Sequence, residues 1–470
     1  AAFCEQNLGI CAMARNPPEL DLSSDYSSEE GPTSSDSDLD TSDDEEFAGV
    51  SALAIAFNIA KGIVGIGILS LPAGIAAGTG LVTGLLILIA MYVVILYTFW
   101  NLGRCCEATH QKTHAGIGLA LTGNHRFGAV MEVTNIIGTL LGGAGYALVI
   151  GRSSSDMWKA MGINAWFTDS RISFMAIMIV VLLPLCLLRD LSKLAFTSML
   201  GLACELSVII FMIARYIGGE YQPGGRYYDS QEPGTQQSWG DADGPSLFDV
   251  NLTALVLVGT ASNAFMAHWN SPTFYHQLRD RKPRSFLKAT VGGFTIALVL
   301  NVVCMIVGYL SFGKNCQGNI LHNYSAKDQW ATCSSGAMLF ATIFGFPINF
   351  TGLRTAFLAL FGLGSRRRIW VSVNVFLLAV ICVLGFSFTD LGVLAAFAGS
   401  LLCALVIFVY PGLMVMWSYN RSQTFSSGKD IFRRVEGECV APALVVFGVM
   451  LSLFGTTTVV LTDMLGVKLQ

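Results

Sequence analysis

The sequence predicts an all-α polytopic membrane protein, and three observations lead to this fold class. Apolar residues make up 53% of the chain and charged residues only 13%, whereas soluble proteins are about 25% charged. Most apolar residues gather in runs near the roughly 20 residues that a helix needs to cross a bilayer. Two of these runs are interrupted by glycine, proline and polar residues. We therefore expect many membrane crossings and broken helices in the first and sixth segments.

Charge divides the chain into two parts. The first 49 residues hold 13 acids and one base, which leaves 27 bases and 19 acids in the rest. Residues 1–47 include a serine- and acid-rich tract, residues 17–47, with almost nothing apolar to bury, so we expect 1–47 to form a disordered, acidic cytoplasmic tail. A phosphorylated regulatory segment and a plain solvated extension both fit this composition. Residues 48–470 are expected to form the transmembrane domain.

Eleven apolar segments follow the tail. A cytoplasmic N-terminus is favoured, because lysine and arginine then gather in the cytoplasmic loops. The acidic start lacks the basic region of a signal peptide, so the first segment is expected to act as a retained signal anchor. The segments span approximately 50–77, 80–102, 128–151, 171–188, 194–217, 250–276, 286–311, 332–361, 369–388, 391–417 and 437–461.

The first segment carries the stretch FNIAKGIVGIGILSLP at residues 57–72. It contains Lys61 together with Gly62, Gly65 and Gly67, and each glycine weakens a helix interior by about 1 kcal/mol relative to alanine. In hydrocarbon, a backbone group freed by a break must find another partner, and a substrate can be that partner. A glycine-lined packing face is the alternative. The lysine and the closing proline favour a broken helix.

The sixth segment repeats these features in the stretch VGTASNAFMAHWNSPTFYHQL. Polar groups at membrane depth are costly, and their presence indicates function. Five segments from the first break to the fifth, and five from the sixth onward, fit a 5+5 inverted repeat plus one helix. No residue-level match between the halves supports this repeat, so it rests on the segment count and the two breaks. The unusual residues are Gly259, Thr260, Ser262, Asn263, His268, Asn270 and Ser271.

Three ionisable side chains inside apolar segments are candidates for ion coupling. Lys61 lies about eleven residues, or roughly 16 Å, from the expected cytoplasmic end of its segment, which is too deep for snorkelling. Glu205 lies midway along the fifth segment, and burial can bring such a carboxyl group into the neutral titration range. His268 titrates naturally near physiological pH. A helix-packing contact for Glu205 and a capping role for His268 are the alternatives.

One loop expected on the outer side combines two cysteines with a sequon. Cys316 and Cys333 flank Asn323-Tyr324-Ser325, and both features suit an oxidising, glycosylating compartment. We expect a disulfide between the two cysteines and a glycan on Asn323. The remaining cysteines are mostly scattered singly in apolar runs, without zinc spacing.

Neither an enzyme nor a nucleic-acid-binding protein is indicated. The sequence has no G-x-S-x-G motif, no phosphate-binding loop and no paired His/Cys metal spacing, so we expect no catalytic residues, no metal and no cofactor. A channel is the rival transport class. Channels usually carry repeated pore elements or rings of like charge, and the sequence has neither.

Three motifs together resemble the amino acid/auxin permease family. They are GIVGIGILSLP in the first segment, FMAH followed by a proline and Tyr275 in the sixth, and FPIN ahead of Arg354 in the eighth. The resemblance covers roughly residues 48–461. It implies a leucine-transporter-like fold with eleven helices and substrate held between broken helices one and six. It also implies transport of neutral amino acids by a multi-pass protein of the plasma membrane or of a vacuolar or lysosomal membrane.

The resemblance further implies where the substrate would bind. Backbone at the first break would receive the substrate carboxylate, and carbonyl groups at the second break would receive the α-amino group. Polar side chains of the sixth segment would tune selectivity. The residues concerned are Gly65, Ile66 and Gly67 in the first segment, and Ser262, Asn263, Ala264, Phe265 and His268 in the sixth.

The chain departs from the sodium-coupled branch of that family at two expected sodium ligands. Lys61 replaces a small polar residue, and Gly345 stands where a hydroxyl would precede Pro347. An ammonium group cannot donate a lone pair to sodium, but it can occupy the place of the ion. Lys61 resembles the lysine of proton-assisted amino acid transporters, so a co-transported proton is expected rather than sodium. A sodium-coupled symporter and an amino-acid-sensing transceptor are the alternatives.

Overall fold

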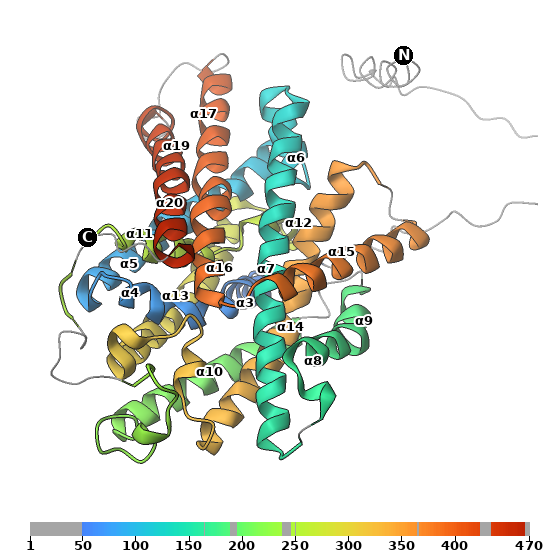
Figure 1. Ribbon diagram of the computed structural model, residues 1–470. Helices are drawn as coiled ribbons and strands as arrows, with labels where there is room; N and C mark the ends of the chain where they lie inside the picture. The colour runs from blue at the N-terminus through green and yellow to red at the C-terminus, as the bar shows by residue number, and fades with distance from the viewer. Residues whose placement is uncertain are drawn as a thin grey trace, which may run out of the picture. The chain divides into compact units, whose positions relative to one another are not determined.

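The computed structural model describes residues 49–163, 165–188, 195–236, 246–249, 251–363, 366–423 and 434–465, so the predicted tail at 1–47 lies outside them. The described fold is all-helical, as predicted (Figure 1). The α-helices are α3 (Ala52–Ile63), α4 (Leu71–Ala76), α5 (Leu81–Thr109), α6 (His114–Thr122), α7 (His125–Ala160), α8 (Ser170–Ile177), α9 (Leu183–Cys186), α10 (Ala195–Ile217), α11 (Ala254–Ala264), α12 (Ser271–Gln277), α13 (Pro283–Phe312), α14 (Gln329–Leu360), α15 (Arg367–Ser387), α16 (Leu391–Ala398), α17 (Tyr410–Gln423), α19 (Ala441–Met450) and α20 (Thr456–Val459). The short helical turns that concern the site are η1 (Ile66–Ser70), η6 (His268–Asn270), η8 (Ile320–Asn323) and η9 (Gly399–Cys403).

Among the described residues, eight helices are long and apolar enough to cross a bilayer. Helix α3 and the following pair η1 and α4 pass the same test together, with a bend of 42° between them. A shorter apolar helix covers Ser170–Cys186. The eight spans are Leu81–Thr109, His125–Ala160, Ser198–Ile217, Pro283–Asn315, Gln329–Leu360, Arg367–Ser387, Leu391–Asn420 and Glu436–Met464.

Large apolar side chains remain exposed on the outward faces of these helices. Leu86 on α5 is 62% exposed, Val383 on α15 is 67% exposed and Val446 on α19 is 62% exposed. In water such side chains would favour association, whereas in a bilayer the lipid tails cover them. The surface therefore agrees with the hydropathy of the spans.

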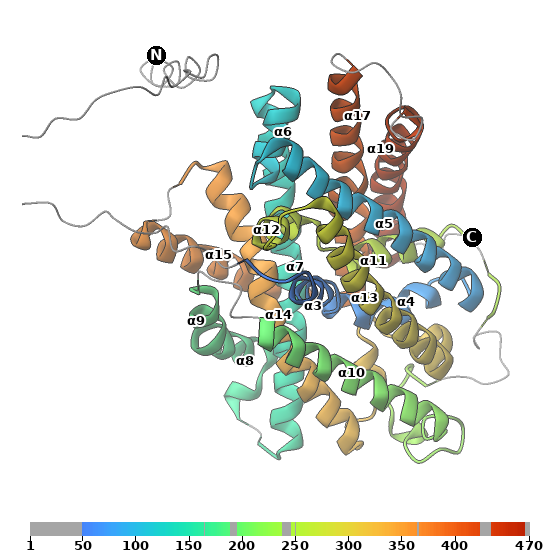
Figure 2. The same cartoon turned by 180° about the vertical axis from the view of Figure 1, so that it is seen from behind.

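Two helix pairs hold the interior together. The long helix α7 packs along α14, and α3 lies against α13 with α10 beside it (Figures 1 and 2). Close approach of α3 and α13 needs a glycine, because a Cβ atom on Gly293 would lie 2.7 Å from the carbonyl oxygen of Ala56. The residues of the first segment are consequently enclosed by helices from both halves of the chain.

A short backbone bridge joins the start of the first segment to the end of the sixth. The Val50 N–H donates to the Gln277 carbonyl at 2.8 Å, and the Arg279 N–H donates to the Val50 carbonyl at 3.0 Å. The side chain of Arg279 adds a bond from Nε to the Gly49 carbonyl at 3.2 Å. One end of α3 and one end of α12 are thus tied through main-chain atoms.

The loop between α13 and α14 contains Asn323, on which the sequence predicts a glycan. That side chain is fully buried. Its Nδ2 donates to the Asn315 carbonyl at 2.8 Å and the Thr235 carbonyl at 3.4 Å, and its Oδ1 accepts from the Gln317 N–H at 2.8 Å. Nδ2, the atom that would carry a glycan, thus connects loop segments through main-chain carbonyls. The glycan stays a prediction.

The two cysteines expected to pair are free thiols in the structure. Cys316 is half-buried, and its Sγ donates to the Gly308 carbonyl at 3.5 Å. Cys333 is exposed in the first turns of α14. The disulfide therefore stays a prediction.

Candidate functional site

The helix of the first segment breaks between Ile63 and Ile66. The Val64 N–H still bonds to the Ala60 carbonyl at 2.7 Å, but Val64 itself is extended, with φ −75° and ψ 104°. Gly65 follows with φ −158° and ψ −135°, and helical structure resumes as η1. The break exposes the last carbonyl groups of α3 and the first N–H groups of η1 to other partners.

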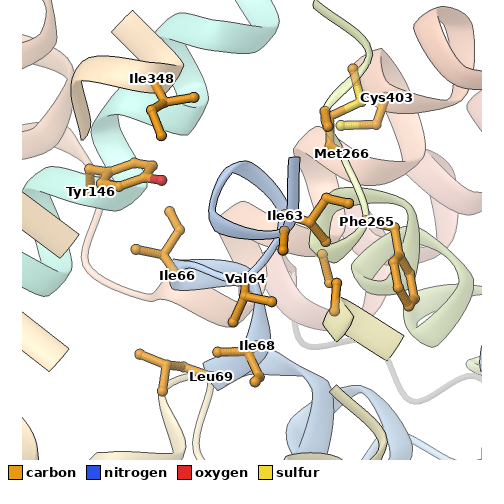
Figure 3. Close-up of a cluster of buried hydrophobic side chains, with 14 of the residues drawn as sticks. Ile63, Val64, Ile66, Ile68, Leu69, Tyr146, Phe265, Met266, Ile348 and Cys403 are labelled. Atoms are coloured by element: carbon orange, nitrogen blue, oxygen red, sulfur yellow. The ribbon is translucent and has the colours of Figure 1, made fainter. Parts of the chain in front are cut away.

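The sixth segment is interrupted at the same place in space. Helix α11 ends at Ala264, and helical structure resumes at His268 after an irregular turn. A Cβ atom on Gly67 would lie 2.7 Å from the Cα of Ala264, so only glycine permits this contact. Figure 3 shows Phe265 and Met266 on one side of the first break and Tyr146 on the other. The two predicted breaks therefore touch each other.

A buried ion pair lies beside the first break. Lys61 on α3 pairs with Oε1 of Glu205 on α10, and these side chains are 0% and 1% exposed. The ammonium also donates to the Val64 carbonyl at 3.4 Å. The second carboxylate oxygen of Glu205 is buried without a hydrogen-bond partner among the described residues. Removing either partner would leave a buried, unpaired charge, which is strongly destabilising.

Glycines leave room for the lysine side chain between α10 and α14. A Cβ atom on Gly201 would lie 2.7 Å from the Cε of Lys61, and one on Gly345 would lie 3.4 Å from its Nζ. Both positions would crowd the ammonium if they carried larger residues. In the sequence, Gly345 stands where sodium-coupled relatives are expected to carry a hydroxyl ligand, and the structure brings this glycine next to the lysine.

Tyr146 on α7 is the third side chain at this place. A Cβ atom on Gly65 would lie 3.2 Å from the Tyr146 hydroxyl, and one on Gly345 would lie 3.3 Å from it. The hydroxyl points toward the break (Figure 3). Its only signal in the sequence is a tyrosine that closes the small-residue run GGAGY, a pattern that indicates close helix packing. Sequence reasoning therefore misses it.

The polar side chains of α11 face other partners. The Ser262 hydroxyl donates to the Val258 carbonyl of its own helix at 2.8 Å. Asn263 Oδ1 accepts a long bond of 3.9 Å from the Cys403 thiol of η9. Phe265 is buried with its ring 6.2 Å from that of Tyr92. The backbone of this region lies at the break, while the side chains of Ser262 and Asn263 bond elsewhere.

His268, the third coupling candidate, lies apart from the ion pair. Its Nε2 is 3.0 Å from the Thr98 hydroxyl on α5, and its ring meets the ring of Phe99 edge-on at 5.4 Å. The other ring nitrogen, Nδ1, is buried without a partner among the described residues. The structure thus joins Lys61 with Glu205 and places His268 against α5.

Two further buried charged residues, Glu132 and Arg354, bond to other helices. Glu132 on α7 accepts a bond from the Ala115 N–H in the first turn of α6 at 2.8 Å. Arg354 on α14 lies 3.9 Å from the Trp370 ring centre and donates to the Cys186 carbonyl at 2.7 Å. Across the described residues, no group of three or more His, Cys, Asp or Glu side chains could hold a metal ion.

A polar cavity of 920 Å³ opens away from the breaks. It lies between the end of α7 and the loop that contains η8, and its lining includes Arg152, Asp156, Lys159 and His322. Burial, reinforced by Arg152, lowers the pKa of His322 to about 4, so this imidazole is neutral at physiological pH. Residues of the two breaks do not line this cavity, and Gly65, Ile66 and Gly67 are all buried.

The fold is that of a known class of membrane proteins. The structure is similar to the crystal structure of MhsT in complex with L-phenylalanine, with a TM-score of 0.60 and 12% sequence identity. The similarity covers 86% of this chain and 99% of MhsT. The chain therefore has a leucine-transporter-like fold, and its apolar spans together with its family, given next, make it an integral, multi-pass membrane protein.

The chain belongs to the family described as "Transmembrane amino acid transporter protein", whose profile matches residues 48–461. Its relatives include sodium-coupled neutral amino acid transporter 7 of Danio rerio, 22% identical over 441 residues, with 88% of each chain covered. Amino acid transporter AVT6E of Arabidopsis thaliana is 24% identical over 400 residues, covering 79% of this chain and 76% of the relative. The predicted family is confirmed, and it is a family of amino acid transporters, not of enzymes.

Proposed function

We propose that this protein transports neutral amino acids by alternating access, coupled to protons and independent of sodium. The observation that carries the proposal is the buried Lys61–Glu205 pair beside the first helix break. Secondary transporters of this general architecture hold substrate and coupling ion at such breaks. A fixed ammonium group with a titratable carboxylate partner is the chemistry that a proton-coupled carrier requires.

Eleven membrane crossings fit the helices. Eight long spans, the bent pair that begins with α3 and the shorter helix at 170–186 account for ten. Helices α11 and α12, with the irregular turn between them, supply the eleventh. With a cytoplasmic N-terminus, these crossings agree with a 5+5 repeat and one additional helix. The tail at 1–47 would then be cytoplasmic. The transceptor alternative depends on this tail, which lies outside the described residues.

The substrate would bind where the two breaks meet. The N–H groups at the start of η1, at Gly65, Ile66 and Gly67, carry partial positive charge and would donate hydrogen bonds to the carboxylate. The carbonyl end of α11, at Asn263 to Phe265, carries partial negative charge and would accept the α-amino group. The Tyr146 hydroxyl faces the same break and adds a donor for the carboxylate.

The coupling step follows from the ion pair. A proton that binds Glu205 neutralises its carboxylate and removes the attraction between α10 and α3. Release of that proton on the opposite side restores the pair and resets the carrier. A Cβ atom on Gly345 would lie 3.4 Å from the Lys61 ammonium, which supports the proposal that this ammonium stands in place of a sodium ion. His268 is the remaining candidate for a relay group.

Sodium-coupled symport is the second candidate. It is favoured by the names of the relatives, such as sodium-coupled neutral amino acid transporter 7 of Bos taurus, which is 22% identical over 389 residues. At this identity individual ion ligands can differ between relatives. The lysine among the expected ligands therefore weighs more in our proposal than the names do.

Reconstitution in liposomes tests the proposal directly. Labelled neutral amino acids are offered under imposed gradients of protons or of sodium. We expect uptake to persist when choline replaces sodium, and to rise when the external medium is acidified. Strict dependence on sodium, with no response to a proton gradient, would favour the second candidate instead.

A further inference from the structure

Asn301, in the middle of α13, has hydrogen-bonding capacity that the described protein leaves unused. The side chain is 0% exposed. Within the described residues, neither Oδ1 nor Nδ2 has a hydrogen-bond partner. A buried amide without partners is costly, and native structures seldom keep one without a reason. A bound ligand is such a reason.

The register between α13 and α3 puts Asn301 at the level of the first break. Gly293 lies against Ala56, and counting eight residues onward along both helices leads to Asn301 and Val64. Gly308 lies against Pro72, where a Cβ atom would be 2.7 Å from Cγ, and counting back seven residues leads to Asn301 and Gly65. Both contacts, Gly293 with Ala56 and Gly308 with Pro72, therefore place Asn301 beside the break at Val64 and Gly65.

The neighbouring turn shows which way this face of α13 points. Cys304, three residues after Asn301, donates from its Sγ to the Ile68 carbonyl of η1 at 3.5 Å. Residues three apart on a helix share a face. Asn301 accordingly lies on the side of α13 that contacts the broken segment.

The chemistry at this level favours a small cation as the partner of Oδ1. The last carbonyl groups of a helix lack partners within the helix, and they carry partial negative charge. Here α3 ends at Ile63, so these carbonyls and the Asn301 amide lie at one level. The Val64 carbonyl already receives the Lys61 ammonium. The carbonyl groups of the preceding residues, at the end of α3, are the groups that a second positive charge would meet.

We propose that Asn301 is a further substrate-binding residue, whose Oδ1 accepts a hydrogen bond from the α-ammonium group of the amino acid. The inference rests on the proposed function, since it takes an amino acid as the ligand. It adds α13 to the two broken helices as a third wall of the binding site. The same oxygen atoms would also attract a sodium ion, so the experiment distinguishes sodium from the α-ammonium group.

The test compares Asn301→Leu with Thr290→Val in the purified full-length protein. Thr290 lies on the same helix, about 16 Å away along its axis at 1.5 Å per residue. It is also fully buried, and its hydroxyl has no partner in the described residues. Both variants remove an unused polar group, so neither should lower the melting temperature of the ligand-free protein. Amino acid affinity is read from the stabilisation that added substrate produces.

Asn301→Leu should weaken amino acid binding about ten-fold to a hundred-fold, the effect of one lost hydrogen bond to a charged group, while Thr290→Val leaves it unchanged. The deaminated carboxylic acid analogue has no hydrogen-bond donor at the α-carbon and should bind wild type and Asn301→Leu equally. Equal loss for the amino acid and the deaminated acid would overturn the assignment to the ammonium. A loss that appears only as weaker activation by sodium, measured against choline, would assign Asn301 to sodium and overturn the proposal.

These outcomes are independent of the coupling ion. If wild-type uptake proves strictly sodium-dependent, the proposed proton coupling fails, yet the affinity difference at Asn301 is still measured. If amino acid affinity is unaffected by Asn301→Leu, the inference fails while transport itself stands.

Discussion

Lys61 and Glu205 combine two charges at a depth where each alone would be unstable. The full burial of both side chains makes their contact with each other the main compensation for lost hydration. The glycines at 201 and 345 lie closely against the lysine, and the Tyr146 hydroxyl lies beside Gly345. A substitution on either side of the pair therefore affects stability and transport together.

Lys61→Ala should destabilise the protein by about 3–5 kcal/mol, the usual effect of removing one partner from a buried pair. The double variant Lys61→Met with Glu205→Leu should recover most of this loss, because no buried charge remains. Thermal unfolding in detergent measures both effects. Arg434→Ala is the matched control, since Arg434 pairs with Glu438 in the open at 3.0 Å and should leave the melting temperature unchanged.

Recovery of stability without recovery of transport would be the informative combination. It would show that the pair is needed for coupling and not only for folding. If the double variant were as unstable as Lys61→Ala, the charge argument would be wrong.

Sequence alone could select Lys61 and Glu205, because a charge inside an apolar run is rare and calls for a function. It could not pair them, since 144 residues separate the two. It also selected Ser262 and Asn263 as polar residues of the sixth segment, but not the direction in which their side chains point. A lone asparagine such as Asn301 gives the same kind of signal as Lys61, only weaker.

At the scale of elements, glycine spacing predicted the interruption of the first segment, and the structure explains each glycine differently. Gly67 is required by the contact with Ala264, and Gly201 by the lysine stem. A Cβ atom on Gly62 would lie 3.7 Å from the nearest side-chain atom, on Ile348, which is ordinary packing distance. The structure therefore excludes a side chain at Gly67 but leaves room for one at Gly62, although both lie in one stretch.

Gly67→Ala should abolish most uptake, because its Cβ would press on the backbone of α11 and separate the two breaks. Gly62→Ala should transport normally and gain about 1 kcal/mol of stability, since alanine favours the helix interior. Initial uptake rates in liposomes compare the two, with membrane insertion verified for each. Equal rates for both variants would mean that the contact between the breaks is dispensable.

Helix boundaries were less predictable than helix positions. The third segment was expected at 128–151, whereas α7 runs from His125 to Ala160. Hydropathy falls where polar residues such as Ser153 and Asp156 begin, but a helix needs only its own backbone hydrogen bonds to continue. The burial of Asn323 was not predictable for a related reason, because a sequon does not reveal whether the fold buries its asparagine.

At the scale of the whole molecule, packing joins segments that are distant in sequence. Helix α7 lies along α14, and α3 lies along α13. Helix α11 also lies against η1 and α4, so the first and sixth segments meet at their breaks, an arrangement that the family resemblance implies. The similarity to MhsT at 12% identity shows that this arrangement tolerates almost complete change of sequence.

The Lys61–Glu205 pair also determines how the carrier responds to an electric field. A lysine and a carboxylate held together carry no net charge, so an empty carrier would reorient without moving charge between the two compartments. A loaded carrier would move a zwitterionic amino acid and one proton, and therefore one positive charge. Each such charge gains about 2.3 kcal/mol per 100 mV of membrane potential.

Net uptake should consequently be electrogenic, and an interior-negative potential should accelerate it. Current recordings on proteoliposomes would show a substrate-induced current that saturates with amino acid and grows with acidity. Without substrate, a voltage step should produce no slow charge movement. A slow charge movement in the empty carrier would mean that the pair is not neutral during return. Because Glu205 stays beside Lys61 in the empty carrier, the membrane potential would act only on the step in which the loaded carrier reorients.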